Sequence, residues 1–372
     1  LLPQDVDILN KFLTENIKLE NFDNFKYILS NSQYPNSRFY AANSLMRLIT
    51  SNYLTIPADC VLQLHNDLIE FIVNYFLTQH DKSEQLYTHS KPLLNALINL
   101  FCRIVRLYWF AHPVFKNVFA TVTYPIKGDN FHSQLIVFII FSELINQFQM
   151  PNLPPKNKLY RFISDFKENA LFNIYTYATE FLIEVLNKIE FEDFGCHLIY
   201  FSTIANCINE ALEYEEDLNA RDDNYKKFEI RPSYIPNNHK RKSRDRTLNV
   251  ESLINIISRL FEHNKILSKL QCESNSQCLS LLQKYCTMKP FYLGENKMSF
   301  LNNLIVGIDE IMLTKIGIMN EKSYEDFCKL IFLLKKNFNC NDLLQNLGFI
   351  DNILKFTTES INNCKIFFNF SS

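Results

Sequence analysis

An all-α fold, in which helix pairs stack into a right-handed superhelix, is the architecture that this sequence predicts. Apolar residues recur at helical spacing (i, i+3, i+4, i+7) along almost the whole chain, and the strict alternation typical of strands is rare. Only six of the 372 residues are Gly, whereas nucleotide-binding sheets, barrels and hairpins need Gly where φ is positive or the backbone approaches a ligand. Helix pairs joined by short turns recur about every 40 residues, the period of HEAT and armadillo repeats. Periodicity alone leaves a compact all-α globule as the alternative.

The individual helices follow from the apolar pattern and from the turn residues between them. Asn36 and Ser37 are good N-caps for the third helix, and Pro57 opens the fourth helix, where a missing N–H costs nothing. Pro113 and Pro151 mark turns further along the chain. The predicted helices span residues 4–15, 20–30, 36–52, 57–79, 83–110, 114–122, 131–149, 157–189, 193–214, 248–263, 266–286, 296–315, 321–337 and 342–362.

One segment interrupts the helical pattern. From Glu213 the chain changes from acidic to basic within about 30 residues, and it contains two Pro. We therefore expect N-terminal repeats at residues 1–213, a long charged loop at 214–247 and further repeats at 248–372. The basic residues of this loop are a candidate nuclear-localisation signal or phosphate-binding patch, and a solvated loop is the alternative. They are Lys240, Arg241, Lys242, Arg244 and Arg246.

Composition and charge exclude several classes of partner. The chain has 38 Lys and Arg against 40 Asp and Glu, so it lacks the positive excess that nucleic-acid binding requires. The longest uncharged apolar stretch, Leu135 to Phe141, is too short to cross a bilayer, and we expect no membrane partner.

The ten Cys include no CxxC pair and mostly lie among apolar residues, which indicates a reducing compartment. Because the first residue is Leu, we expect the chain to be a fragment of a longer protein.

Sequence motifs for catalysis and nucleotide binding are absent. The chain contains no GxGxxG, GxxxxGK[ST], HExxH or GxSxG, and its eight His show no metal-ligand spacing. We therefore expect no enzyme, no cofactor and no metal, although an acid/base pair assembled across helices remains an alternative. The function that is left is recognition of another protein by helix faces.

Three predicted helices carry polar residues on one side and apolar residues on the other. At about 100° per residue, the polar residues of helix 83–110 fall within an arc of about 80°. Amide and Arg side chains are good directional partners for the carboxylates and backbone of another protein. The alternative is an outer surface without function. The polar positions are Asn36, Tyr40, Asn43, Arg47 and Thr50 in helix 36–52, Asn95, Asn99, Arg103 and Arg106 in helix 83–110, and His132, Glu143, Asn146 and Gln147 in helix 131–149.

Five stretches of the chain, taken in order, carry a family likeness. They are FYAANSLMRLIT (39–50), LLNALINLFCRIVRLYWFAHPVFKNVFATVT (93–123), FKENALFNIYTYATEFL (166–182), MSFLNNLIVGIDEIM (298–312) and SYEDFCKLIFLLKKNF (323–338). The second stretch includes the run Arg103, Arg106, Trp109, Phe110, Phe115, Asn117 and Val118. Together the stretches resemble the N-terminal region of the exportin-7 (Ran-binding protein 16/17) branch of the importin-β superfamily.

The resemblance implies a nuclear transport receptor built from HEAT repeats. Such receptors bind the small GTPase Ran in its GTP form through the inner helices of the first repeats, and they hold no nucleotide themselves. The resemblance also implies protein cargo, nuclear-pore FG-repeat proteins as partners, and shuttling between nucleus and cytoplasm. Carried onto helices 36–52, 83–110 and 131–149, it implies a set of Ran-binding residues. These are Asn43, Arg47, Asn95, Asn99, Arg103, Arg106, Glu143 and Asn146.

Two other functions remain compatible with the sequence. The first is an import or bidirectional receptor of the same superfamily, because the direction of transport depends on the sign of the coupling between cargo and Ran. The second is a HEAT-repeat scaffold that does not bind Ran.

Overall fold

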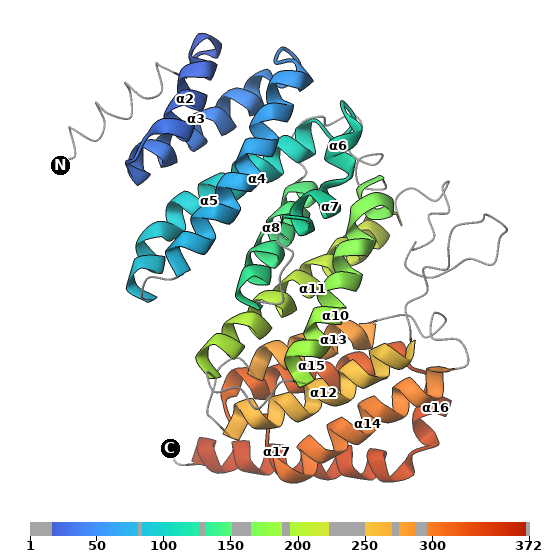
Figure 1. Ribbon diagram of the computed structural model, residues 1–372. Coiled ribbons are helices and arrows are strands. Elements are labelled where there is room, and N and C mark those ends of the chain that lie inside the picture. The colour runs from blue at the N-terminus through green and yellow to red at the C-terminus, as the bar shows by residue number, and fades with distance from the viewer. Residues whose placement is uncertain are drawn as a thin grey trace. The chain divides into compact units, whose positions relative to one another are not determined.

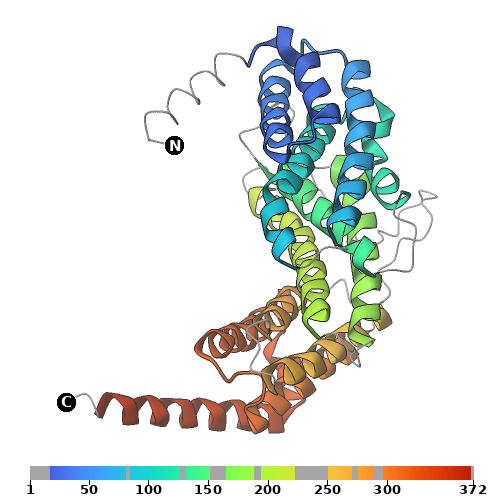
Figure 2. The ribbon, with the colours of Figure 1, turned by 60° about the vertical axis from the view of Figure 1, so that its left-hand side comes forward.

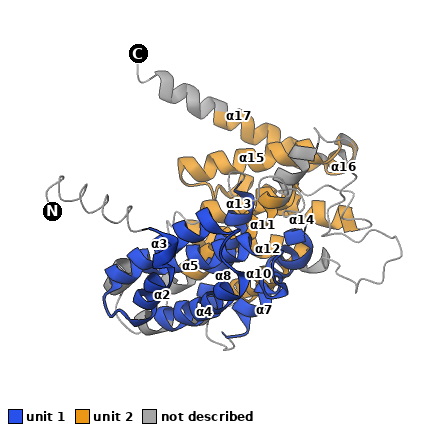
Figure 3. Cartoon of the chain, turned by 90° about the horizontal axis from the view of Figure 1, so that it is seen from above, with its two compact units in different colours: residues 1–175 blue, residues 176–372 orange. Residues whose placement is uncertain are grey.

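The computed structural model describes residues 17–80, 84–125, 131–150, 165–187, 194–222, 250–269, 275–287 and 296–369. Within these ranges every regular element is a helix, and the predicted all-α class is confirmed (Figure 1). None of the described helices is both long and apolar enough to span a membrane. The chain divides into two compact units, Leu1–Tyr175 and Thr176–Ser372, which Figure 3 colours blue and orange.

The helices of the first unit form stacked pairs. Here α2 packs on α3, α4 packs on α5, and the short α7 packs on α8. The second helix of each pair also contacts the next one, so that α3, α5 and α8 form one continuous inner layer. Figures 1 and 2 show these helices in blue to green. The elements are η1 (Leu19–Asn21), α2 (Phe22–Asn31), α3 (Pro35–Asn52), α4 (Ala58–His80), α5 (Glu84–Leu107), α6 (Pro113–Lys116), α7 (Val118–Thr123), α8 (Phe131–Gln149) and the π-helical η3 (Lys167–Leu171).

The second unit repeats this arrangement with two layers. One layer runs through α11, α13 and α15, the other through α12, α14 and α17, and α12 packs on α13. The boundary between the units falls within α10. The elements are α10 (Phe172–Asn187), α11 (Phe194–Asp222), α12 (Val250–Lys269), α13 (Asn275–Thr287), α14 (Lys297–Thr314), α15 (Glu321–Asn337), α16 (Cys340–Leu344) and α17 (Leu347–Asn369).

Polar contacts between successive repeats recur at similar sequence separations in the second unit. Ser258 Oγ donates to Asn303 Oδ1 at 2.9 Å, a separation of 45 residues. Asn352 Nδ2 donates to Asp309 Oδ1 at 3.1 Å, and these residues are 43 positions apart. The recurrence matches the period of HEAT repeats, and with the paired helices it confirms the predicted solenoid type.

Some predicted helix boundaries are wrong. The break near residue 265 is absent, since α12 continues to Lys269. His263 and Asn264 lie within this continuous helix, and both side chains are fully buried. At the other end of the unit, α11 extends to Asp222, past the predicted end at residue 214. Helix 83–110 instead ends at Leu107, because a turn leads into α6, which His112 caps by accepting from the Val114 N–H at 3.2 Å. The predicted helix 4–15 lies outside the described residues, and the predicted limits of the repeat arrays stay a prediction.

A buried histidine lies in the apolar core of the first unit. His65 of α4 stacks on Phe101 of α5, with ring centroids 4.8 Å apart, and contacts Phe115 edge-on at 5.1 Å. Desolvation by this aromatic environment lowers the pKa of His65 from 6.5 to about 4, although the Asn66 side chain favours the charged form. The folded protein therefore keeps His65 neutral at pH values where the unfolded chain protonates it.

We expect His65 to make the fold sensitive to acid. As the pH falls from 6.5 to about 4, only the unfolded state gains a proton at His65, so stability is lost across this window. At about 1.4 kcal/mol per pKa unit, the loss approaches roughly 3 kcal/mol. His65→Phe keeps an aromatic ring and removes the titration. Urea unfolding by circular dichroism at pH 7 and pH 4.5 should show a smaller pH effect for the variant; an equal effect in both proteins would contradict this assignment.

Gly307 of α14 is needed for the close approach of α12. A Cβ atom at residue 307 would lie 2.2 Å from the Phe261 ring, closer than real Cβ contacts. We expect Gly307→Ala to lower the free energy of unfolding by about 1–3 kcal/mol, because overpacking outweighs the gain in helix propensity. Gly348→Ala in α17 is the control, since a Cβ there meets nothing within 4 Å. Urea unfolding of both variants measures the difference, and a Gly307→Ala protein as stable as the control would exclude the close packing.

A candidate partner-binding face on the inner helices

Arg103 is the centre of a polar cluster that joins all three inner helices of the first unit. Its Nε donates to Gln147 Oε1 of α8 at 2.8 Å, and its Nη1 donates to Thr50 Oγ1 of α3 at 3.4 Å. Gln147 Nε2 in turn donates to Glu143 Oε1 at 2.5 Å. The structure therefore brings Arg103 and Glu143, both predicted from sequence, into one cluster.

Partial burial changes the electrostatics of this cluster. Desolvation lowers the pKa of the Arg103 guanidinium, and the nearby Glu143 carboxylate opposes this effect. Desolvation also raises the pKa of Glu143, against the effects of the Gln147 hydrogen bond and of Arg103. In both groups desolvation is the largest effect, so each has only part of the solvation that it would have in water. Nη2 of Arg103 has no partner among the described residues, and it can bond a partner's carboxylate without breaking the contacts that orient the side chain.

The remaining predicted residues surround Arg103 to different extents. Arg47 and Asn95 are exposed, and Asn99 is half-buried. Asn43 is half-buried and donates its amide to the Phe39 carbonyl oxygen one turn earlier, at 2.9 Å. Asn146 is half-buried on α8. Arg47 forms no ion pair within the described part of the chain, so its charge is available to a partner.

Arg106 is buried, although the helical wheel placed it on the polar surface of its helix. Its side chain is only 1% exposed, and its guanidinium donates to the carbonyl oxygens of Gln147 and Met150, the latter at 2.8 Å. These carbonyls belong to the C-terminal end of α8, where a helix has unpaired acceptors and a partial negative charge. The helical wheel placed Arg106 beside Asn99 because it ignores neighbouring helices. The polar side of α5 is exposed at Asn95 and covered by α8 at Arg106.

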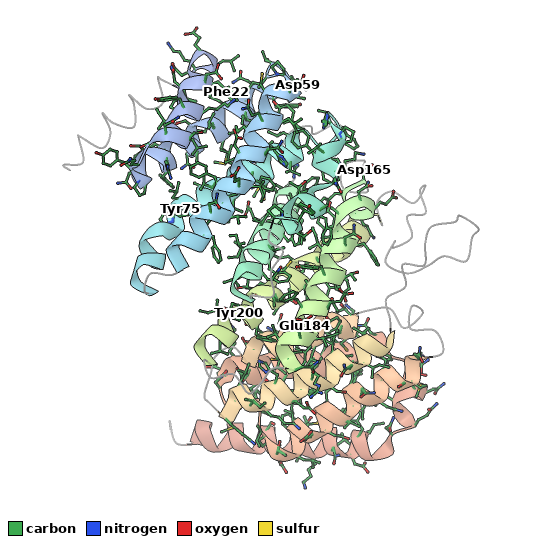
Figure 4. All side chains as sticks on the ribbon, viewed as in Figure 1. Phe22, Asp59, Tyr75, Asp165, Glu184 and Tyr200 are labelled. Atoms are coloured by element: carbon green, nitrogen blue, oxygen red, sulfur yellow. The ribbon has the colours of Figure 1, made fainter. Side chains whose placement is uncertain are left out.

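The residues after Arg106 form an aromatic cluster rather than a binding surface. Trp109 is fully buried, and its Nε1 donates to Asp165 Oδ2 at 2.7 Å. Its ring meets Phe148 and Phe166 edge-on, with centroids 5.0 and 5.6 Å away. Lys116 pairs with the same Asp165 oxygen at 2.6 Å, and Figure 4 labels Asp165 at this end of the unit. This cluster packs the turn after α5 against Phe148 near the end of α8, and the same two helices carry Arg103 and Gln147.

Two residues of the cluster were not among the predicted site residues. Thr50 and Gln147 orient Arg103, and the helical wheels did place both on the polar sides of their helices. Their role depends on the register between helices, which a wheel of one helix does not contain. The predicted basic residues Lys240 to Arg246 lie outside the described part of the chain. Within the described part, no group of three or more His, Cys, Asp or Glu is placed to hold a metal ion.

The fold and this face define a HEAT/armadillo-type helical solenoid with a polar inner layer. No protein-family model matches the chain. Among curated proteins, Exportin-7-B of Xenopus laevis is 23% identical over 342 residues, which cover 88% of this chain and 29% of that protein. Ran-binding protein 17 of Homo sapiens is 23% identical over 83% of the chain and 26% of its own length. Ran-binding protein 16 of Drosophila melanogaster is 21% identical over 87% of the chain and 29% of its own length.

The predicted resemblance to exportin-7 and Ran-binding proteins 16 and 17 is therefore confirmed over most of the chain. The chain spans less than a third of the length of these curated relatives. Their names describe an exportin and Ran-binding proteins, not enzymes, which is consistent with the expectation that this chain is not an enzyme.

The two arginines of α5 should respond differently to substitution. We expect Arg106→Gln to lower the free energy of unfolding by about 3 kcal/mol, because buried carbonyls at the end of α8 lose charge-assisted hydrogen bonds. Arg103→Gln should change it by less than about 1 kcal/mol, since the side chain is only partly buried. Urea unfolding followed by circular dichroism compares the two variants. Equal effects would contradict the distinction between a structural Arg106 and an accessible Arg103.

Proposed function

We propose that this chain is part of an exportin-type nuclear transport receptor that binds Ran in its GTP form. The observation that carries the proposal is the similarity over 83% to 88% of the chain to proteins named exportin-7 and Ran-binding protein. The HEAT-type solenoid is compatible with it, because such arrays present extended surfaces to protein partners. The receptor would act as a binding protein without a cofactor, and it would shuttle between nucleus and cytoplasm.

The inner face of α3, α5 and α8 is the proposed contact with Ran. Arg47 and Asn95 are exposed, and Arg103 has unused donors, so these residues can bond carboxylates and backbone groups of a partner directly. Asn99, Asn43, Glu143 and Asn146 would contribute further polar contacts around them. Arg106, which is buried, would hold α8 against α5 and so keep the face in place, without touching Ran.

The physical mechanism of transport would be reciprocal coupling. If Ran·GTP and cargo favour the same arrangement of repeats, each raises the affinity of the other by the same factor. Release of one partner then promotes release of the other. FG-repeat proteins of the nuclear pore would bind the receptor during passage, and neither nucleic acid nor a membrane would be needed.

Two alternatives predict different results. An import or bidirectional receptor would also bind Ran·GTP, but cargo affinity would fall when Ran·GTP is added. A HEAT scaffold would show no partner whose binding depends on the nucleotide. Cargo release assays with and without Ran·GTP separate export from import.

The first test compares two nucleotide states of Ran. We expect this chain to bind Ran loaded with a non-hydrolysable GTP analogue more tightly than GDP-loaded Ran, by at least about tenfold. Isothermal titration calorimetry with both forms measures the difference. Equal affinity for the two forms would argue against a transport receptor and favour the scaffold.

The second test locates the contact. Arg47→Glu combined with Arg103→Gln should weaken binding of Ran·GTP by about 100-fold, because two charge-assisted contacts are lost. Gln is chosen at residue 103 because a new carboxylate there would repel Glu143. Arg259→Glu in α12 is the charge-reversal control, since Arg259 is a half-exposed Arg of the second unit and is not one of the residues proposed to contact Ran. If the control weakens binding as much as the double variant, the proposed face is wrong.

A further inference from the structure

A second surface of the first unit has the chemistry of a binding site. A groove with a volume of about 640 Å³ lies where one side of α4 meets α3 and the end of α2. Asp67, Glu70, Phe71 and Tyr75 of α4 line it together with Arg38 of α3, and Figure 4 labels Tyr75. This volume is within the range of sites that hold drug-sized ligands or short peptides. The groove does not include Arg47, Arg103 or the other residues of the inner face.

The charges in this groove are not neutralised by each other. Arg38 lies over the ring of Phe71, with its guanidinium carbon 4.7 Å from the ring centroid. It forms no ion pair with Asp67 or Glu70, although all three side chains line the same groove. The Nε atom of Arg38 is buried and has no hydrogen-bond partner. The groove therefore offers two carboxylates as acceptors and a guanidinium as donor.

The spacing of these groups suits an extended chain. Asp67, Glu70 and Phe71, and then Tyr75, follow one side of α4 at helical spacing. This side is opposite the buried Ile69 and Phe76, and it spans about 12 Å at 1.5 Å per residue. Three or four extended residues of a peptide cover the same length.

We propose that this groove binds a short basic peptide segment of a partner protein. A Lys or Arg side chain would place its charge between Asp67 and Glu70, and its aliphatic stem against the ring of Tyr75. Arg38 would donate to a carbonyl oxygen of the same peptide. The two carboxylates outnumber the one guanidinium, which favours a cationic ligand. A peptide fits better than a simple cation because its carbonyl oxygens can also accept from Arg38. This site goes beyond the proposed contact with Ran.

The test uses a fluorescein-labelled Lys-Arg-Lys-Arg peptide and an uncharged Gln-Gln-Gln-Gln peptide. Fluorescence anisotropy with the whole chain should show binding of the basic peptide only. Asp67→Asn combined with Glu70→Gln should weaken this binding by about tenfold, because both acceptors for the cation lose their charge. The control is Glu180→Gln combined with Glu184→Gln, which removes two exposed carboxylates one turn apart on α10 and should change binding by less than about twofold.

A third variant tests the role of Arg38. If Arg38 donates to a peptide carbonyl, Arg38→Gln weakens binding of the basic peptide. If the groove binds only the cationic side chain, Arg38→Gln removes a like charge and strengthens binding. This second result would overturn the peptide proposal. Equal losses in the two carboxylate double variants would show non-specific attraction and would also overturn it. Binding of Ran·GTP should be unchanged in the Asp67→Asn and Glu70→Gln protein. Loss of peptide binding in this variant therefore tests the groove separately from the proposed contact with Ran.

Discussion

The hydrogen bonds from the buried Arg106 guanidinium to the last carbonyl groups of α8 fix two inner helices against each other. They supply a partner to acceptors that a helix end always leaves open, and they place a positive charge at the negative end of the helix dipole. One turn earlier on α5, Arg103 then meets Gln147 in register. Trp109, three residues after Arg106, packs edge-on against Phe148 and Phe166, and Phe148 directly follows Gln147 in the sequence. The geometry of the inner face thus depends on a buried interaction that no partner touches.

The second unit shows how a chain with so few Gly builds a regular array. Each repeat contacts its neighbours through side chains about 44 positions apart, as in Ser258 with Asn303 and Asp309 with Asn352. Gly307 remains where α12 and α14 approach too closely for a Cβ atom. Gly317 has a φ of +102° in the turn before α15, and Ser268 Oγ accepts its N–H at 3.0 Å. These two glycines are placed where a side chain would meet a neighbouring helix or strain the backbone.

The fold class, most helices and the family likeness could be predicted from sequence, because apolar periodicity and sparse Gly are local properties of the chain. The candidate site could be predicted only in part. Arg47 and Asn95 are exposed as expected, whereas Arg106 is covered by α8. A helical wheel describes one helix, so it cannot show where the next helix ends. The groove at Asp67 and Glu70 was missed for the same reason, since it needs Arg38 from another helix.

The buried position of Trp109 has a spectroscopic consequence. It is the only tryptophan in the chain, and it lies within the first compact unit. Its emission therefore reports the loss of packing in that unit alone, while the helical dichroism signal comes from both units. If the two signals change at different denaturant concentrations, the units unfold as separate cooperative blocks; if they coincide, the array unfolds as one. The sequence thus contains a built-in, label-free probe of how far cooperativity extends along the solenoid.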